Sequence, residues 1–198
     1  MLLFHGSKAS FTTFDDQHVG SGEGAGVQTG FYFTEYLKGA AHHASSYLSN
    51  LDGVAKVYVC RLKPHARVLT RGKPITEHDP ELLTFWKDQL PVAKSCTAAS
   101  RNWFDQLIPS CTTGKETCAY LRNAGFHAIV DFEGGDQVDG YLGGSCILVI
   151  DPAAIEIVEV LPVADIHPET IQFRQHILAE SKQALCANGV LSYLRRAE

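Results

Sequence analysis

The stretch Gly30-Phe31-Tyr32-Phe33-Thr34 decides the fold, because its pattern is that of a β-strand. Aromatic and β-branched residues favour strands. Alternation with a period of two puts Phe31 and Phe33 on one face and Tyr32 on the other. Gly30 allows the chain to enter the strand sharply. A second strand must pair with this one, and polar residues at the edges of the pair are candidates for a binding site.

The candidate partner strand lies at the N-terminus. Leu2–Phe4 is a short apolar run, and a turn signal follows directly at His5, Gly6 and Ser7. A histidine at the end of a strand can reach a ligand. Gly6 lacks a side chain, so its backbone N–H and C=O can come close to a planar amide. Ser7 adds a hydroxyl group.

A helix is predicted over residues 35–48, directly after the aromatic strand, because this segment is rich in alanine. Tyr47 falls near its end. One tyrosine on the strand, Tyr32, and one on the helix could enclose a flat ring between them. Offset aromatic stacking contributes about 0.5–1.5 kcal/mol beyond the burial of area.

The remaining pattern predicts one domain over residues 1–198 in the α+β class. Residues 20–26 are rich in glycine and predict a flexible segment, which glycine content alone identifies as a plain linker. A helical insertion is expected at about 74–113, where it packs on the sheet or contacts a target, and a helical tail at about 168–198. Further strands are predicted at 54–62, 67–70, 127–132, 146–152 and 154–160, with a helix over 113–123 that ends at Gly125.

Composition limits the classes of partner and compartment. The chain has 198 residues, 45% hydrophobic residues and a formal net charge of −5, so no general attraction to nucleic acid is expected. The sequence shows no secretory signal and no membrane span. Its six cysteines form no CxxC pair and are interpreted as reduced thiols in a cytoplasmic protein.

The two motifs together, His5-Gly6-Ser7 and Gly30–Thr34 followed by a helix with Tyr47, resemble the ADP-ribosyltransferase superfamily. The branch is the His-Tyr-Glu branch, which includes the poly-ADP-ribose polymerases, diphtheria-toxin-like enzymes and many bacterial and phage toxins. A second similarity lies in the apolar strand that closes in Asp151-Pro152 and in the strand after it. The resemblance covers residues 1–72 and 114–160. It implies a split β-sandwich, with two facing antiparallel-rich sheets around a cleft.

The resemblance also implies roles for individual residues. His5 would bind the ribose of NAD, Gly6 would bind the nicotinamide amide, and Tyr32 and Tyr47 would stack on the nicotinamide ring. Ser7 and Phe31 would flank this site. NAD would be a substrate, and no metal is implied. The expected activity is mono-ADP-ribosylation by a toxin or effector, with a protein acceptor first and a nucleic-acid acceptor second, and with a cognate inhibitor or antitoxin as a further candidate partner.

One residue departs from the family pattern. Active members carry a glutamate at the start of the apolar strand, about where Ser145 or Cys146 lies. A carboxylate there stabilises the oxocarbenium-like ribose that forms when nicotinamide leaves. The acidic, glycine-rich loop at 133–139 offers Asp139 and Gln137 as the nearest substitutes. Two alternatives therefore stay open: a non-catalytic NAD- or nucleotide-binding module, and an interaction domain in which His5 and Tyr32 are only packed.

Overall fold

The structure is a computed structural model. Most of the expected insertion and the expected tail at 168–198 lie outside the described residues. Within the expected insertion, Pro80, Glu81 and Thr84 are described and are helical. The description covers residues 1–19, 30–45, 52–78, 80, 81, 84, 114–132 and 146–166.

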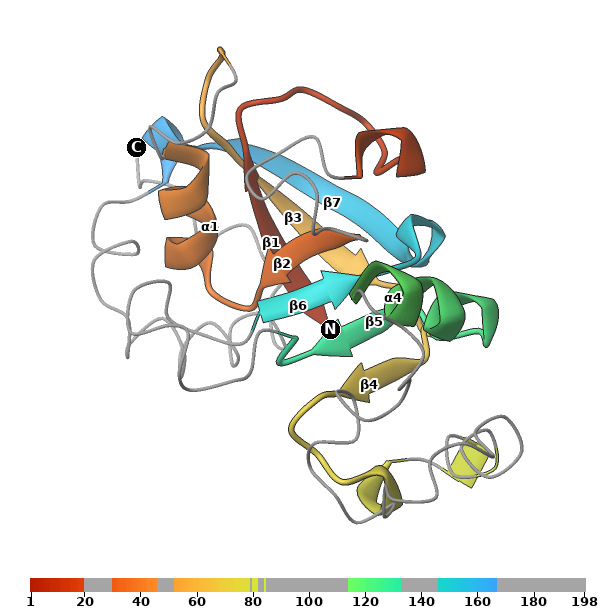
Figure 1. The fold of residues 1–198 in the computed structure, drawn as a ribbon. Coiled ribbons are helices and arrows are strands. Elements are labelled where there is room, and N and C mark those ends of the chain that lie inside the picture. Colours follow the sequence, from red (N-terminus) through yellow and green to blue (C-terminus); the bar gives the residue numbers. More distant parts are fainter. Residues whose placement is uncertain are drawn as a thin grey trace.

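Seven strands of the described part of the chain form one sheet in the order β4-β5-β6-β2-β1-β3-β7 (Figure 1). All neighbours are antiparallel except β4 and β5, which are parallel. The α+β class is therefore confirmed. The strands are β1 (Leu2–Ser7), β2 (Phe31–Thr34), β3 (Lys56–Leu62), β4 (Val68–Thr70), β5 (Ala128–Val130), β6 (Cys146–Val149) and β7 (Ile155–Pro162).

Two α-helices pack on one face of this sheet. Helix α1 (Leu37–Ser45) buries its alanines against the cluster that contains Phe4, and α4 (Gly114–Asn123) packs against the cluster that contains Leu148. Register places Phe4 opposite Thr34, and Tyr32 opposite Leu148, so these side chains share a face. Short 3₁₀ helices complete the description: η1 (Asp16–His18), η2 (Ile75–Glu77), η4 (Pro152–Ala154) and η5 (Val163–Asp165).

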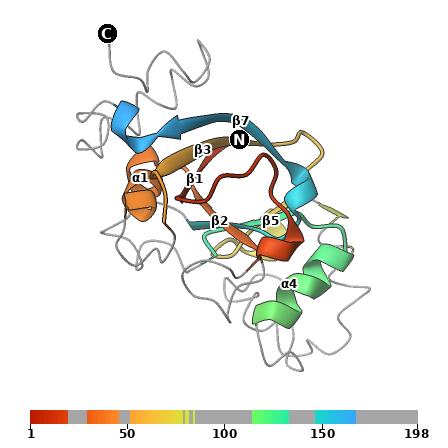
Figure 2. The ribbon, with the colours of Figure 1, turned by 90° about the horizontal axis from the view of Figure 1, so that it is seen from above.

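The opposite face is covered by the segment that follows β1. Phe11 and Phe14 of this segment pack against the cluster that contains Phe33, Tyr58 and Ile147. Figure 2 shows the segment looping over the sheet and ending beside α4. The long strands thus have apolar side chains on both faces, which explains the continuous burial of residues 57–60.

The join between β1 and β2 is the narrowest in the sheet. Only the pair Phe4–Thr34 links them, whereas six pairs link β1 to β3. We expected two facing sheets, and the hydrogen-bonding pattern instead gives a single sheet whose two halves meet at this one pair. Beyond the Phe4–Thr34 pair the two strands separate. There the side chain of His5 connects them through a hydrogen bond to the backbone carbonyl of Tyr32.

Element boundaries differ slightly from the sequence-based expectation. The helix after β2 begins at Leu37 rather than at residue 35, because the hydroxyl of Thr34 accepts a hydrogen bond from the backbone of Tyr36 at 3.1 Å and forms a turn there. Helix α4 ends before Gly125, as predicted, and that glycine has φ +85°. Neither α1 nor α4, nor any other helix in the described ranges, is long and apolar enough to cross a membrane.

Candidate functional site

The imidazole of His5 is held by the backbone of the neighbouring strand. Its Nδ1 lies 2.7 Å from the carbonyl oxygen of Tyr32. A carbonyl oxygen can only accept, so Nδ1 carries the ring proton, and in the neutral ring Nε2 remains an acceptor. The bond fixes both the tautomer and the orientation of the ring. His5 can therefore accept a hydrogen bond from a hydroxyl group.

Four aromatic rings surround the imidazole. Their centroids lie 5.3 to 6.3 Å from that of His5, and none is parallel to it. Burial lowers the pKa of His5, the bond to the Tyr32 carbonyl opposes this effect, and the nearby charge of His43 lowers the pKa further. His5 is therefore neutral at pH 7. The surrounding rings are those of Phe11, Phe14, Phe33 and Tyr58.

We expect the free energy of unfolding to decrease as pH falls below 6.5, the ordinary pKa of histidine. The pKa of His5 is lower in the folded state, so between the two pKa values the unfolded chain binds the proton first. The contribution of neutral His5 to the free energy of unfolding is complete above pH 6.5 and is lost as pH falls toward the pKa of His5 in the folded protein. The urea unfolding midpoints at pH 7 and pH 5 measure this loss. His5→Gln should flatten the pH dependence of the unfolding free energy, whereas His65→Gln, at an exposed histidine, should leave it unchanged. An equal pH dependence in wild type and both variants would contradict its assignment to His5.

The side chain of Tyr32 points to the opposite face from that of His5. It packs in the cluster under α4, with its ring 6.0 Å from that of Phe132. Phe31 and Phe33 lie on the His5 side, as the alternation predicts. The structure therefore joins His5 and Tyr32 through the backbone of Tyr32 and does not bring their side chains into one cavity.

Gly6 and Ser7 both have structural partners. A Cβ at Gly6 would lie 1.9 Å from the carbonyl oxygen of Ala40 and 2.8 Å from the nitrogen of Ala44, so the glycine lets α1 approach β1. The hydroxyl of Ser7 accepts a hydrogen bond from the backbone of Ala9 at 3.1 Å and stabilises the turn after β1. The close approach of α1 to β1 therefore explains why a glycine is required at position 6, without any contact to nicotinamide.

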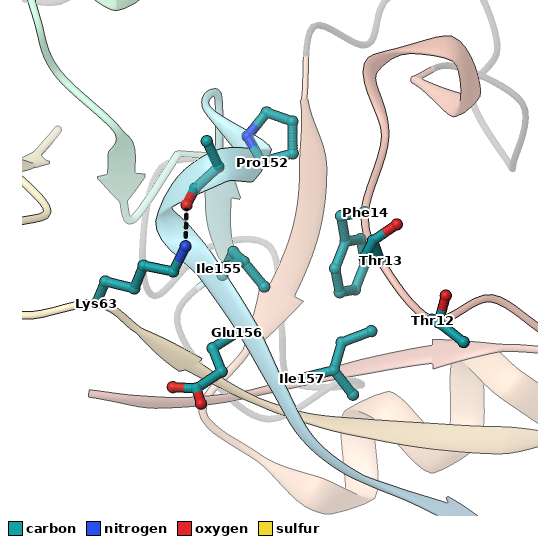
Figure 3. A pocket seen from close by; sticks show the side chains of 9 residues that line it. Thr12, Thr13, Phe14, Lys63, Pro152, Ile155, Glu156 and Ile157 are labelled. Atoms are coloured by element: carbon teal, nitrogen blue, oxygen red, sulfur yellow. Dashed lines mark hydrogen bonds between the residues drawn. The ribbon is translucent and has the colours of Figure 1, made fainter.

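A groove of about 400 Å³ is lined in part by Phe14, whose ring centroid lies 5.3 Å from that of His5. Figure 3 shows Thr12, Thr13 and Phe14 facing the first residues of β7 across it. Lys63 closes one end by donating a hydrogen bond from Nζ to the carbonyl of Ala153 at 2.7 Å. Its walls combine apolar side chains with hydroxyl groups and two charged groups. The remaining lining residues are Pro152, Ile155, Glu156 and Ile157.

A charged cluster lies where α4 meets the end of β6. The guanidinium of Arg122 donates two hydrogen bonds of 2.8 Å to the carboxylate of Asp16, and it also lies 3.4 Å from Asp151. Asp151 caps η4 by accepting from the backbone of Ala153. The bonds to Asp16 raise the pKa of Arg122. Sequence reasoning did not find this cluster, because Asp16, Arg122 and Asp151 are far apart in the chain.

Several expected site residues lie outside the described residues: Tyr47, Gln137, Asp139 and Ser145. Cys146 is described and begins β6, partly buried and opposite Thr34. The three described cysteines, Cys60, Cys118 and Cys146, are not in disulfide bonds, and burial raises the pKa of Cys60 to about 12. Within the described ranges no group of three or more histidine, cysteine or acidic side chains is placed to hold a metal ion.

Comparison of the chain with models of protein families, with curated proteins and with solved structures found no match.

Proposed function

We propose that this protein is an NAD-dependent mono-ADP-ribosyltransferase that acts on a protein or nucleic-acid acceptor. The observation that carries the proposal is the adjacency of three strands that are distant in the sequence. Strands β1, β2 and β6 carry the three motifs and lie side by side in the order β6-β2-β1. Thr34 lies opposite both Phe4 and Cys146, so the first and third motifs are two strands apart, about 10 Å.

The narrow β1–β2 join supports the finer fold assignment, a split β-sandwich of the ADP-ribosyltransferase type. The sheet divides there into β4-β5-β6-β2 on one side and β1-β3-β7 on the other. A sheet held by one pair between its halves can bend at that point. The motif residues cluster at this junction, where a split would place a binding site.

His5 fits the chemistry of a ribose-binding residue. Its Nδ1–H is committed to the Tyr32 carbonyl, so the neutral ring accepts from a hydroxyl at Nε2. Gly6 and Tyr32, the two residues that the resemblance assigns to nicotinamide, lie on the opposite face of the sheet from His5, so the proposal requires NAD to reach both faces where β1 and β2 part. In the proposed reaction the bond between nicotinamide and ribose breaks, and a nucleophile of the acceptor bonds to the same ribose carbon. Transition-state charge on the ribose requires electrostatic stabilisation.

A labelled-NAD assay tests the proposal. We expect wild-type protein to release nicotinamide and to label a discrete protein or nucleic acid in a lysate. His5→Ala should reduce the rate roughly 10²-fold, because loss of one positioning contact misplaces the ribose. The exposed His65→Ala is the matched control and should retain the wild-type rate. No turnover and no NAD binding by calorimetry would reject the assignment.

One observation favours a second candidate, a non-catalytic NAD- or nucleotide-binding module. Cys146 stands at the start of β6, where the resemblance calls for glutamate, and a thiol provides no fixed negative charge. NAD binding without nicotinamide release would support this candidate over the transferase.

A further inference from the structure

Strand β7 is the outer strand on one side of the described sheet. It ends the strand order next to β3, and no other described strand pairs with its second side. An outer strand presents a row of backbone N–H and C=O groups that can pair with a further strand. The groove of about 400 Å³ is lined by the first residues of β7, so it is a place where such pairing can begin.

The hydrogen-bond pattern between β3 and β7 determines which backbone groups face outward. The N–H of Lys63 donates to the carbonyl of Ala154 at 3.0 Å, so these two residues form a hydrogen-bonded pair. Hydrogen-bonded and non-hydrogen-bonded pairs alternate along an antiparallel ladder. Ile155 and Ile157 therefore belong to non-hydrogen-bonded pairs, and their backbone groups point away from β3. The N–H of Ile155 bonds to Pro152, which leaves the carbonyl of Ile155 and both backbone groups of Ile157 at the outer edge.

The groove lies along this edge, because its lining residues come from both faces of β7. Alternation puts Glu156 on one face and its neighbours, Ile155 and Ile157, on the other. Figure 3 shows Glu156 and Ile157 on opposite sides of the strand. On the first side the groove reaches Lys63, and on the second it reaches Phe14. A ligand in the groove would therefore meet the outward backbone groups of β7 together with side chains on both of its faces.

The side chains beside β7 favour different groups on its two faces. Phe14, Ile155 and Ile157 form an apolar wall and belong to one hydrophobic cluster. The other face presents the carboxylate of Glu156, whose side chain is 55% exposed and lies 3.9 Å from the guanidinium of Arg61. A ligand residue opposite Glu156 is favoured if it is basic, since opposite charges attract across a strand pair. The formal net charge of −5 acts in the same direction.

The rest of the β7 edge is interrupted. The register of β7 against β3 shifts at Val158, which is an extra residue of β7, and Pro162 has no N–H to donate. Bulges and prolines are features that keep an outer edge from pairing without selection. Regular pairing is therefore confined to residues 155–157. A second copy of the chain is disfavoured there, because antiparallel pairing of this stretch with itself would put Glu156 opposite Glu156.

We propose that the edge of β7 at residues 155–157 binds an extended segment of a partner protein, which pairs with it as a further short strand. The segment has two apolar residues on the side of Phe14 and, between them, a basic residue opposite Glu156. In this mode of recognition main-chain hydrogen bonds supply affinity and side-chain pockets supply specificity. Binding of such a segment needs neither NAD nor the transferase reaction and therefore goes beyond the proposed function.

A blocked pentapeptide, threonine–valine–lysine–valine–threonine, is the probe, and the amide NMR signal of Ile157 reports its binding. We expect a saturable shift of this signal, whereas the amide of Val57, a buried residue of β3, should not shift. Methylation of the three central backbone nitrogens of the peptide removes main-chain donors and keeps the side chains, and it should weaken binding about tenfold. No shift of Ile157 at millimolar peptide, or equal affinity of the methylated peptide, would overturn the strand pairing.

Charge reversal in the protein tests the specificity. Glu156→Lys should bind the lysine peptide about two- to fivefold more weakly and should prefer a peptide with glutamate in its place. Glu77→Lys is the matched control, because it makes the same charge change at an exposed residue of η2, just after the strand at the other end of the sheet. Its affinity should equal that of wild type.

Three results would contradict the proposed partner. Equal weakening in Glu156→Lys and Glu77→Lys would mean that only the net charge attracts the peptide. Tighter binding of the glutamate peptide by wild type would mean that Lys63, the other charged group of the groove, sets the preference. A shift of the Ile157 amide that depends on protein concentration without peptide would assign the edge to a second copy of the chain.

Discussion

Gly6→Ala is expected to destabilise the protein by roughly 3 kcal/mol or more, or to abolish its cooperative unfolding transition. A methyl group at this position would lie 1.9 Å from the carbonyl oxygen of Ala40. That atom belongs to the backbone of α1, so no side chain can rotate to relieve the overlap. The helix must move away from β1 and lose its packing against Phe4 and Val57.

Gly72→Ala is the matched control, because no atom lies within 4 Å of a Cβ built at that position. We expect a change of within about 0.5 kcal/mol there. Urea unfolding of both variants measures the difference. If Gly6→Ala unfolded at the wild-type midpoint, α1 would not be seated on β1 as the structure shows, and the glycine would be free for a ligand.

The fold class and most strands could be predicted because their patterns are local. The alternation at 31–33 correctly separated Tyr32 from its neighbours, and the alanine-rich helix appeared where the composition indicated it. Phe11 and Phe14, the large apolar residues of the segment after β1, pack on the sheet. Each of these features depends on residues close together in the sequence.

The face on which His5 lies could not be predicted, because it depends on register between two strands. Pairing of Phe4 with Thr34 puts His5 on the side of Phe33. A shift of one residue would reverse every side chain of β1 and place His5 with Tyr32. Both strands are short and apolar on both faces, so their hydrophobic pattern does not distinguish the two registers.

The contacts of the segment after β1 were equally inaccessible to sequence reasoning. Asp16 and Arg122 are 106 residues apart. Tyr58 lies in the run Val57–Cys60, in which all four side chains are buried, so periodicity does not identify the one whose hydroxyl bonds to the backbone of Ala9 and Phe11. Contacts between distant segments emerge only once the sheet order is known.

Cys146→Glu is expected to raise nicotinamide release about 10²-fold over Cys146→Gln, the neutral variant of equal size. Cys146 and Leu148 lie on the same face of β6, and Leu148 is opposite Tyr32. A carboxylate at the first residue of β6 would therefore lie on the Tyr32 face, two strands from Gly6. Because Cys146 is partly exposed at the end of a strand, a longer side chain should be accommodated there.

The comparison of these two variants separates charge from shape, since both lengthen the side chain equally. A rise only in Cys146→Glu would show that the pocket is complete except for its carboxylate, and wild type would then be the NAD-binding module. If wild type already releases nicotinamide and Cys146→Glu brings no gain, the stabilising carboxylate lies elsewhere in the protein. Asp139→Asn should then abolish nicotinamide release. If wild type and Cys146→Glu both bind NAD and neither releases nicotinamide, the site does not support transfer of ADP-ribose. A correctly placed negative charge would have stabilised the developing cation on the ribose.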